Sequence, residues 1–173
     1  DDGSCEYENL DNILVVPHEF STIQAAIQVA QTGDEVLVHE GEYHENINLL
    51  GKSILVHSLT GAENTFIIGD STISVIICNS DESSETIIDG FTISGGYGIG
   101  VSFEDFISNA ADPDAFENMV VNQMMAGGIS CLNSSPTLQN LIITDNISRN
   151  VAGGIGLVNS NAIIDNVVVE NNL

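Results

Sequence analysis

The chain of 173 residues carries 25 acidic and only 2 basic side chains, which gives a formal net charge of −23. Proteins bind nucleic acids and anionic lipid surfaces through Lys and Arg, so this composition excludes both kinds of partner. Hydrophobic residues make up 43% of the chain, which is enough to bury a core and argues against disorder. No apolar run approaches the ~20 residues of a transmembrane helix, so we expect no membrane insertion.

The N-terminal residues 1–12 predict an acidic tail or linker. A short helix is expected next, because Ser21-Thr22-Ile23-Gln24 has the S-x-x-Q spacing of a capping box that begins at Ser21. Apolar residues then recur at helical spacing until Gly33 ends the pattern.

The rest of the chain predicts many short strands. Ile and Val dominate the apolar residues, and they come in short runs separated by Gly, Asn, Asp and Ser. Two of these runs, Val36–His39 and Ile54–His57, repeat at an offset of 18 residues. This offset places His39 beside His57 in neighbouring repeats.

A clearer repeat has a period of 26 residues. Gly127-Gly128-Ile129 recurs as Gly153-Gly154-Ile155, and three asparagines recur at the same offset. These asparagine pairs are Asn133 and Asn159, Asn140 and Asn166, and Asn146 and Asn172. Such repeats predict the stacked coils of a parallel β-solenoid, in which each Asn column forms a ladder of amides. The alternative is that Asn is used only as a turn residue.

The segments Phe20–Ile27, Gly33–Val38 and Gly51–Ile54 resemble the start of right-handed parallel β-helix proteins of the pectin-lyase-like superfamily. Gly90–Gly96 resembles the repeats of such secreted bacterial proteins. The resemblance implies an all-β solenoid over residues 13–173, with residues 13–35 and their helix as the N-terminal cap. It also implies an extracellular or cell-surface location, but the superfamily includes lyases, hydrolases, adhesins and structural proteins.

Residues 98–126 interrupt the repeat and predict an inserted loop, where function is often found. Its acidic residues are candidate binding groups, namely Glu104, Asp105, Asp112, Asp114 and Glu117.

Two arrangements could support catalysis. The repeat places Asp89 and Asp165 in one column with Gln139 between them, which predicts two carboxylates about 9.6 Å apart. This separation lies near the range of inverting glycosidases, but Asp is also an ordinary turn residue. Lyases of the resembled superfamily use an Arg base and acids that hold Ca²⁺, and Arg149 is the only Arg. An exposed turn Arg is more often a solvated surface group.

Metal sites are weaker predictions. A stacked pair of His39 and His57, with His44 nearby, could hold a divalent ion, although two neutral imidazoles packed on a sheet are the simpler interpretation. Dense carboxylates favour Ca²⁺, with Asp1 and Asp2 as further candidates. An acidic surface without specific sites explains the same composition.

Three cysteines, Cys5, Cys78 and Cys131, allow at most one internal disulfide, and the sequence leaves the pairing open. Cys78 and Cys131 lie in apolar strands, where buried thiols are expected.

These features favour a non-catalytic extracellular scaffold or adhesion module. The last coil has no polar capping segment, so we expect end-to-end stacking into a homo-oligomer or filament, or continuation in a longer chain. The alternatives are a polysaccharide lyase or hydrolase and a glycan-binding module.

Overall fold

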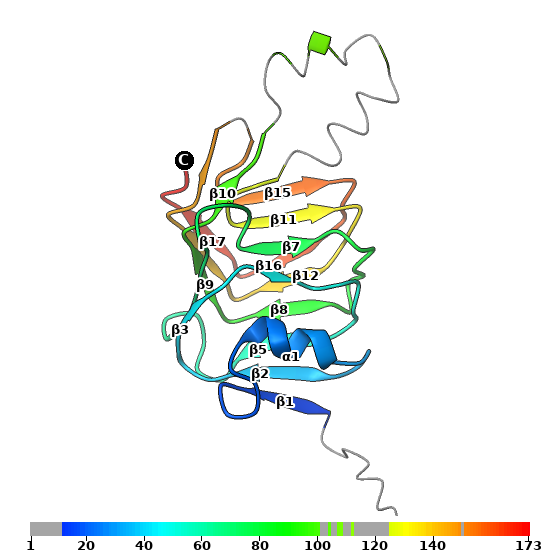
Figure 1. The fold of residues 1–173 in the computed structure, drawn as a ribbon, viewed down its shortest axis with the longest axis vertical. Coiled ribbons are helices and arrows are strands. Elements are labelled where there is room, and N and C mark those ends of the chain that lie inside the picture. Colours follow the sequence, from blue (N-terminus) through cyan, green and yellow to red (C-terminus); the bar gives the residue numbers. More distant parts are fainter. Residues whose placement is uncertain (1–11, 101–103, 105–106, 109–111, 113–124, 150) are drawn as a thin grey trace, which may run out of the picture.

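The computed structural model describes residues 12–100, 104, 107–108, 112, 125–149 and 151–173. Within these ranges the chain winds into coils, and each strand pairs in parallel with the equivalent strand of the neighbouring coil (Figure 1). The strands stack from β1 at the lower end of the view to β15 near the upper end. The predicted right-handed parallel β-helix is confirmed.

The strands form four parallel sheets. The six-stranded sheet has the order β1 (Ile13–Val16), β2 (Glu35–Val38), β5 (Leu55–Ser58), β8 (Ile87–Asp89), β12 (Thr137–Gln139) and β16 (Ile163–Asp165). The five-stranded sheet contains β3 (Gly41–His44), β6 (Thr65–Ile68), β9 (Thr92–Ser94), β13 (Ile142–Thr144) and β17 (Val168–Glu170). The four-stranded sheet contains β4 (Ile47–Asn48), β7 (Ile76–Cys78), β11 (Ile129–Leu132) and β15 (Ile155–Val158). A two-stranded sheet pairs β10 (Tyr97–Gly98) with β14 (Ile147–Ser148).

The core consists of the side chains that point into the coils. Because successive residues of a strand point to opposite faces, every second residue joins a column that continues through the stack. Val36, Val56, Ile88 and Leu138 form one such column of the six-stranded sheet, and none of them has exposed surface. Each coil therefore covers the apolar interior of the next coil.

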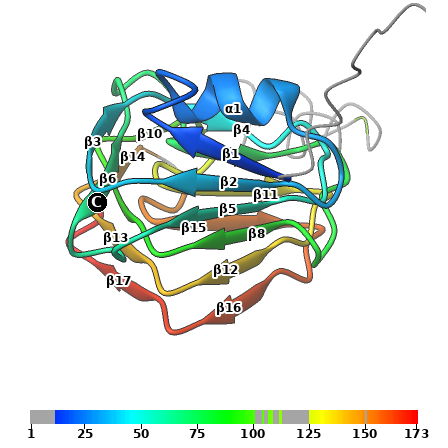
Figure 2. The same cartoon turned by 90° about the horizontal axis from the view of Figure 1, so that it is seen from below.

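The helix α1 (Ile23–Val29) covers the N-terminal end of this core. It packs against β1, β2 and β4, and it buries Ile23, Ala26 and Ile27 (Figure 2). The N-cap is Thr22, whose hydroxyl accepts a hydrogen bond from the Ala25 amide at 3.1 Å, so the predicted start at Ser21 is wrong by one residue. Gln24 does not close a capping box, because its side chain bonds to the backbone of Asn48 in the next coil.

Charged groups from neighbouring coils hold both ends of α1. The Glu45 carboxylate accepts hydrogen bonds from the amides of Ile23 and Gln24 at 2.8 and 2.9 Å. At the other end, the Lys52 ammonium donates to the carbonyl oxygens of Ile27, Gln28 and Ala30 at 2.6, 2.7 and 2.8 Å. Opposite charges thus meet the unpaired N–H and C=O groups of a helix too short to be stable alone.

The asparagine ladders predicted from the 26-residue repeat are confirmed. The side chain of Asn159 donates to Asn133 at 3.1 Å, and that of Asn166 donates to Asn140 at 2.8 Å. These four residues adopt positive φ angles near 50°, so they serve as turn residues as well. In the third column Asn146 is fully buried and donates to Asn172 at 3.0 Å.

The inserted segment leaves the coil after β10 and returns before β11. The Met125 amide donates to the Ile99 carbonyl at 2.8 Å and closes the base of the segment. Gly98 belongs to β10 and Ala126 is buried, so both flanking residues belong to the coils, and the insertion between them stays a prediction.

The two ends of the described solenoid differ. At the first coil, Leu14 and Val16 are 8% and 0% exposed, because α1 packs beside them. At the last coil, Ile164 and Val169 occupy core columns but are 48% and 51% exposed. Among the described residues, no helix has the length and apolar character needed to cross a bilayer.

Candidate functional site

A column of polar side chains runs along the outer face of the six-stranded sheet. His57 pairs with Asp89, Asp89 with Gln139, and Gln139 with Asp165 in the strand register. Each lies at or next to the C-terminal end of its strand, and each alternates with an inward apolar residue. The predicted column of Asp89, Gln139 and Asp165 is therefore formed, with His57 as an additional member.

The two carboxylates of this column have different surroundings. Asp89 is half-buried, and its two oxygens accept hydrogen bonds from the side-chain amides of Gln139 at 2.9 Å and Asn140 at 2.7 Å. Asp165 is exposed on β16, the last strand of the six-stranded sheet. Since β12 separates β8 from β16, the backbone positions of Asp89 and Asp165 lie two strand spacings apart, about 9.6 Å, with Gln139 between them in the register.

His57 also bonds across the coils. Its Nε2 lies 2.6 Å from Oε1 of Glu35, and both side chains are mostly buried. Glu35 and Leu55 belong to a second outward column, which continues with Ile87, Thr137 and Ile163. The face thus presents a polar column beside a largely apolar column.

The predicted stacking of His39 on His57 is wrong. The register pairs Leu37 with His57 and Val38 with Ser58, so the offset between these strands is 20 residues instead of 18. A shift of two residues keeps every side chain on the same face of a strand, so the apolar alternation cannot distinguish the two registers. His39 instead contacts His18, with ring centroids 4.7 Å apart in an edge-on arrangement.

The histidines are not brought together as metal ligands. His44 lies on β3 and is exposed, with Nε2 3.6 Å from the Glu42 carboxylate. In the part of the chain that the structure describes, no three His, Cys, Asp or Glu residues form a group suited to a metal ion. Asp1 and Asp2 lie outside the described residues, so Ca²⁺ binding there stays a prediction.

Arg149 does not share the face of the acidic column. It is exposed and follows β14 of the two-stranded sheet. Between Gln139 and Arg149 the chain turns at Asn140, forms β13, and turns again at Asp145. The five-stranded sheet therefore separates Arg149 from the column along the coil.

The acids of the inserted segment are only partly described. Glu104 and Asp112 are exposed. Asp105, Asp114 and Glu117 lie outside the described residues, so binding by this segment stays a prediction.

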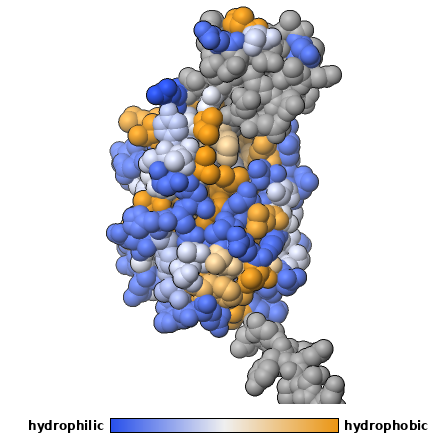
Figure 3. Space-filling model, in the orientation of Figure 1, coloured by the Kyte–Doolittle hydropathy of each residue, from blue (hydrophilic) through white to orange (hydrophobic). Residues whose placement is uncertain are grey.

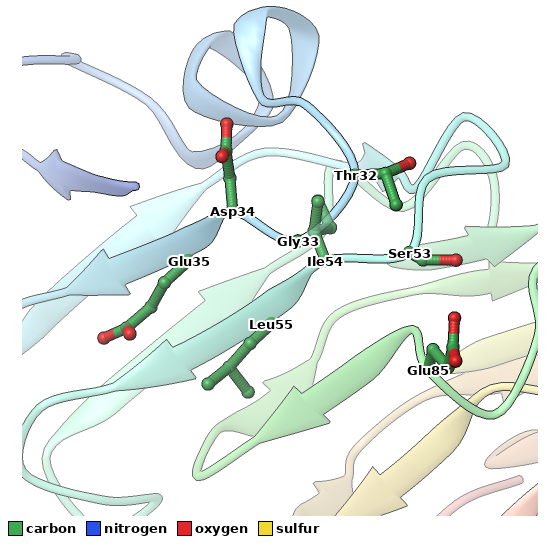
Figure 4. Close-up of a pocket in the computed structure, with 8 residues that line it drawn as sticks. All are labelled: Thr32, Gly33, Asp34, Glu35, Ser53, Ile54, Leu55 and Glu85. Carbon is green, nitrogen blue, oxygen red and sulfur yellow. The ribbon is translucent and has the colours of Figure 1, made fainter. Parts of the chain in front are cut away.

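A cavity of about 290 Å³ opens beside the N-terminal ends of β2 and β5 (Figure 4). Its lining includes the acids Asp34, Glu35 and Glu85 and the hydroxyl residues Thr32 and Ser53. Glu85 points toward Ser53, whereas Asp34 and Glu35 point to different sides of the strand ends. The Asp34 carboxylate accepts a hydrogen bond from the backbone N–H of Gln31 at 2.6 Å, so it also closes the turn after α1.

Sequence reasoning missed the pairing of Glu35 with His57 and the acids of the cavity. Strand alternation alone would have placed Glu35, Leu37, Leu55 and His57 on one face. Predicting that Glu35 bonds to His57 also requires the register between β2 and β5. This register depends on the lengths of the turns, which no sequence motif specifies.

No family model matches the chain, and no curated protein matches it. The chain is similar to parts of solved structures. A pectin methylesterase in complex with hexasaccharide VII has a TM-score of 0.49 and 15% identity, covering 79% of this chain and 42% of that protein. Pectin methylesterase PemA from Erwinia chrysanthemi has a TM-score of 0.47 and 13% identity, covering 79% of this chain and 46% of that protein. The chain spans less than half the length of each of these proteins. The strand pairing itself identifies the chain as a parallel β-helix.

Proposed function

We propose that the chain is a non-catalytic β-helix scaffold or adhesion module that acts outside the cell or at its surface. The observation that carries this proposal is the bonding of Asp89. Both oxygens of this carboxylate accept amide hydrogen bonds from the next coil, at 2.9 and 2.7 Å. The candidate catalytic acid Asp89 is thus part of the hydrogen bonding that joins neighbouring coils.

The chemistry of the alternative enzymes supports the same choice. A glycosidase needs one carboxyl group that gives a proton and one that activates water, with room for substrate between them. Here the Gln139 side chain lies between Asp89 and Asp165. A lyase of the resembled type needs an Arg beside the acids, and Arg149 follows a strand of another sheet.

The acidic surface agrees with such a role. The net charge of −23 discourages contact between the sides of neighbouring molecules. Hydrophilic residues cover most of the described surface in Figure 3, with smaller apolar patches between them.

The proposal includes association with another copy through the last described coil, or continuation of the solenoid in a longer chain. Leu157, Ile164 and Val169 occupy core columns there and are 42%, 48% and 51% exposed. Helix α1 covers the first coil. The exposed last coil of one molecule therefore finds no exposed core at the first coil of another molecule, which disfavours head-to-tail stacking. Two last coils can meet around a two-fold axis, and such a contact closes at a dimer instead of growing into a filament.

Glycan binding is the second candidate. The polar column offers carboxylate, amide and imidazole groups at intervals of one strand spacing, about 4.8 Å, next to an apolar column. Such a face suits an extended hydroxylated chain that runs along the solenoid axis.

The test incubates the protein with a panel of acidic and neutral polysaccharides, with and without Ca²⁺, and measures reducing ends, unsaturated products and released methanol. The proposal predicts no product above the level of a heat-denatured control. Retention of intact polysaccharide on immobilised protein, lost in Gln139→Ala, would favour the glycan-binding candidate. Product formation abolished by Asp165→Asn would refute the non-catalytic role.

A further inference from the structure

Cys78 and Cys131 are direct neighbours in the core. Cys78 is the last residue of β7, and the register pairs it with Cys131 of β11. Neither residue has exposed surface, and both thiols are free. Paired residues of adjacent strands lie about 4.8 Å apart, within the ~4.4–6.8 Å between the Cα atoms of disulfide-bonded cysteines.

The two cysteines lie on strands before and after the inserted segment. The chain between the two cysteines includes β8, β9 and β10 and then residues 99–125. A bond between Cys78 and Cys131 would therefore join the two coils on either side of this segment.

We propose that Cys78 and Cys131 form a reversible disulfide that joins β7 to β11 across the base of the inserted segment. The oxidant is a disulfide of the glutathione type. One cysteine thiolate attacks a sulfur of that disulfide, which forms a mixed disulfide and releases one glutathione thiolate. The second cysteine thiolate then attacks the protein sulfur and releases the second glutathione. Two protein thiols lose two electrons and two protons, and the oxidant becomes two thiols.

Burial determines when this exchange takes place. A hydrogen bond with the neighbouring Cys131 thiol, and secondly burial, raise the pKa of Cys78 well above its usual value. The reactive thiolate is therefore scarce in the folded core. The exchange takes place during folding or when the two coils open.

The bond is expected to be reducible. Stacked Cβ atoms start near the strand spacing of about 4.8 Å and must approach to about 3.8 Å for a disulfide. This approach strains the bond, and strained disulfides are reduced more easily.

Trypsin provides a simple readout, because Lys52 and Arg149 are the only cleavage sites in the chain. Complete digestion under denaturing, non-reducing conditions gives the peptides 1–52, 53–149 and 150–173. Cys78 and Cys131 both lie in 53–149, whereas Cys5 lies in 1–52. A bond between the core cysteines removes two hydrogens from 53–149 and leaves 1–52 separate.

The experiment refolds the full chain from denaturant in buffers of oxidised and reduced glutathione, traps free thiols and analyses the digest by mass spectrometry. We expect the internal bond in 53–149 in oxidised buffer, both in the wild type and in Cys5→Ser. The Cys78→Ser and Cys131→Ser variants are expected to lack it. We also expect refolding in reduced buffer to leave both thiols free.

Two results would overturn the proposal. One is free thiols at Cys78 and Cys131 in Cys5→Ser after oxidative refolding to native circular dichroism. The other is a peptide in which 1–52 is joined to 53–149 as the main wild-type product. An internal bond that persists in reduced glutathione after denaturation and refolding would overturn its reversible character.

Discussion

The Lys52 ammonium group lies at the C-terminal end of α1 and donates a hydrogen bond to the Ile27 carbonyl oxygen at 2.6 Å. Two more carbonyl oxygens of the same helix end accept from it at 2.7 and 2.8 Å. One of only two basic side chains in the protein is thus used to cap the helix that covers the core.

Replacing this cation is expected to destabilise the fold. Lys52→Met keeps the aliphatic length but leaves the last carbonyl groups of α1 without their donor, at a cost of about 2–3 kcal/mol in unfolding free energy. Urea unfolding measures the loss. Arg149→Met changes the net charge by the same amount at an exposed position and should change stability by less than about 0.5 kcal/mol. Equal losses in the two variants would show that overall charge, and not the helix cap, is responsible.

The buried asparagine of the third ladder should contribute more to the stability of the fold than the exposed asparagines do. Asn146 is fully buried, and it bonds to Gly96, Ile93, Thr144 and Asn172. Asn146→Ala removes these bonds and leaves buried backbone groups unpaired, so we expect a loss of about 3 kcal/mol or more. Asn166→Gly breaks only an exposed bond, at a positive φ of 51° that glycine also adopts, and should cost less than about 1 kcal/mol. Thermal unfolding compares the two, and similar losses would contradict the assigned difference in burial.

The ladders were predictable because the coils that contain them have equal lengths. Asn133, Asn140 and Asn146 each recur after 26 residues, so the repeat is visible in the sequence. The histidine register was not predictable. The coil between β2 and β5 has 20 residues, whereas the coil between β5 and β8 has 32, and such differences arise in turns without a repeated motif.

The roles of Lys52 and Glu45 in bonding the ends of α1 could not be predicted from the sequence, for a related reason. Each side chain bonds to helix residues more than 20 positions away, and the contact exists only after the coils have stacked. A sequence pattern can indicate which face a residue occupies, but not which group of the next coil it meets. The candidate acid column was predictable because Asp89 and Asp165 lie in well-aligned repeats.

Glu82 provides a third test. This carboxylate is buried, and it accepts hydrogen bonds from the amides of Gly51 and Ser80 at 2.9 Å and from the Ser134 hydroxyl at 2.6 Å. It thereby joins the corners of three coils. Glu82→Gln turns an amide group toward a donor and should cost about 2–3 kcal/mol. The matched variant Glu85→Gln alters an exposed residue and should be nearly neutral in urea unfolding. A neutral Glu82→Gln would contradict the role given to this carboxylate.

Tyr43 should produce a stability loss at alkaline pH. Burial, and secondly the Glu45 carboxylate, raise the pKa of Tyr43 above its usual value. The folded state therefore holds this proton more tightly than the unfolded state, so the stabilisation is full below about pH 10 and is lost as the pH rises through the folded-state pKa. Urea unfolding from pH 8 to pH 11 measures the slope. Tyr43→Phe loses the 2.9 Å bond to the His39 carbonyl, but its stability should fall less steeply above pH 10. Identical slopes in the two proteins would exclude Tyr43 as the cause.

The central claim is that the acidic column joins coils instead of transforming a substrate. Paired unfolding measurements on Asp89→Ala and Asp165→Ala test this claim most directly. Asp89 accepts two amide hydrogen bonds, so its loss should lower the unfolding free energy by about 2 kcal/mol, while loss of the exposed Asp165 should change it by less than about 0.5 kcal/mol. Unchanged or increased stability of Asp89→Ala would contradict the claim, because the two hydrogen bonds of Asp89 would then contribute nothing to joining the coils.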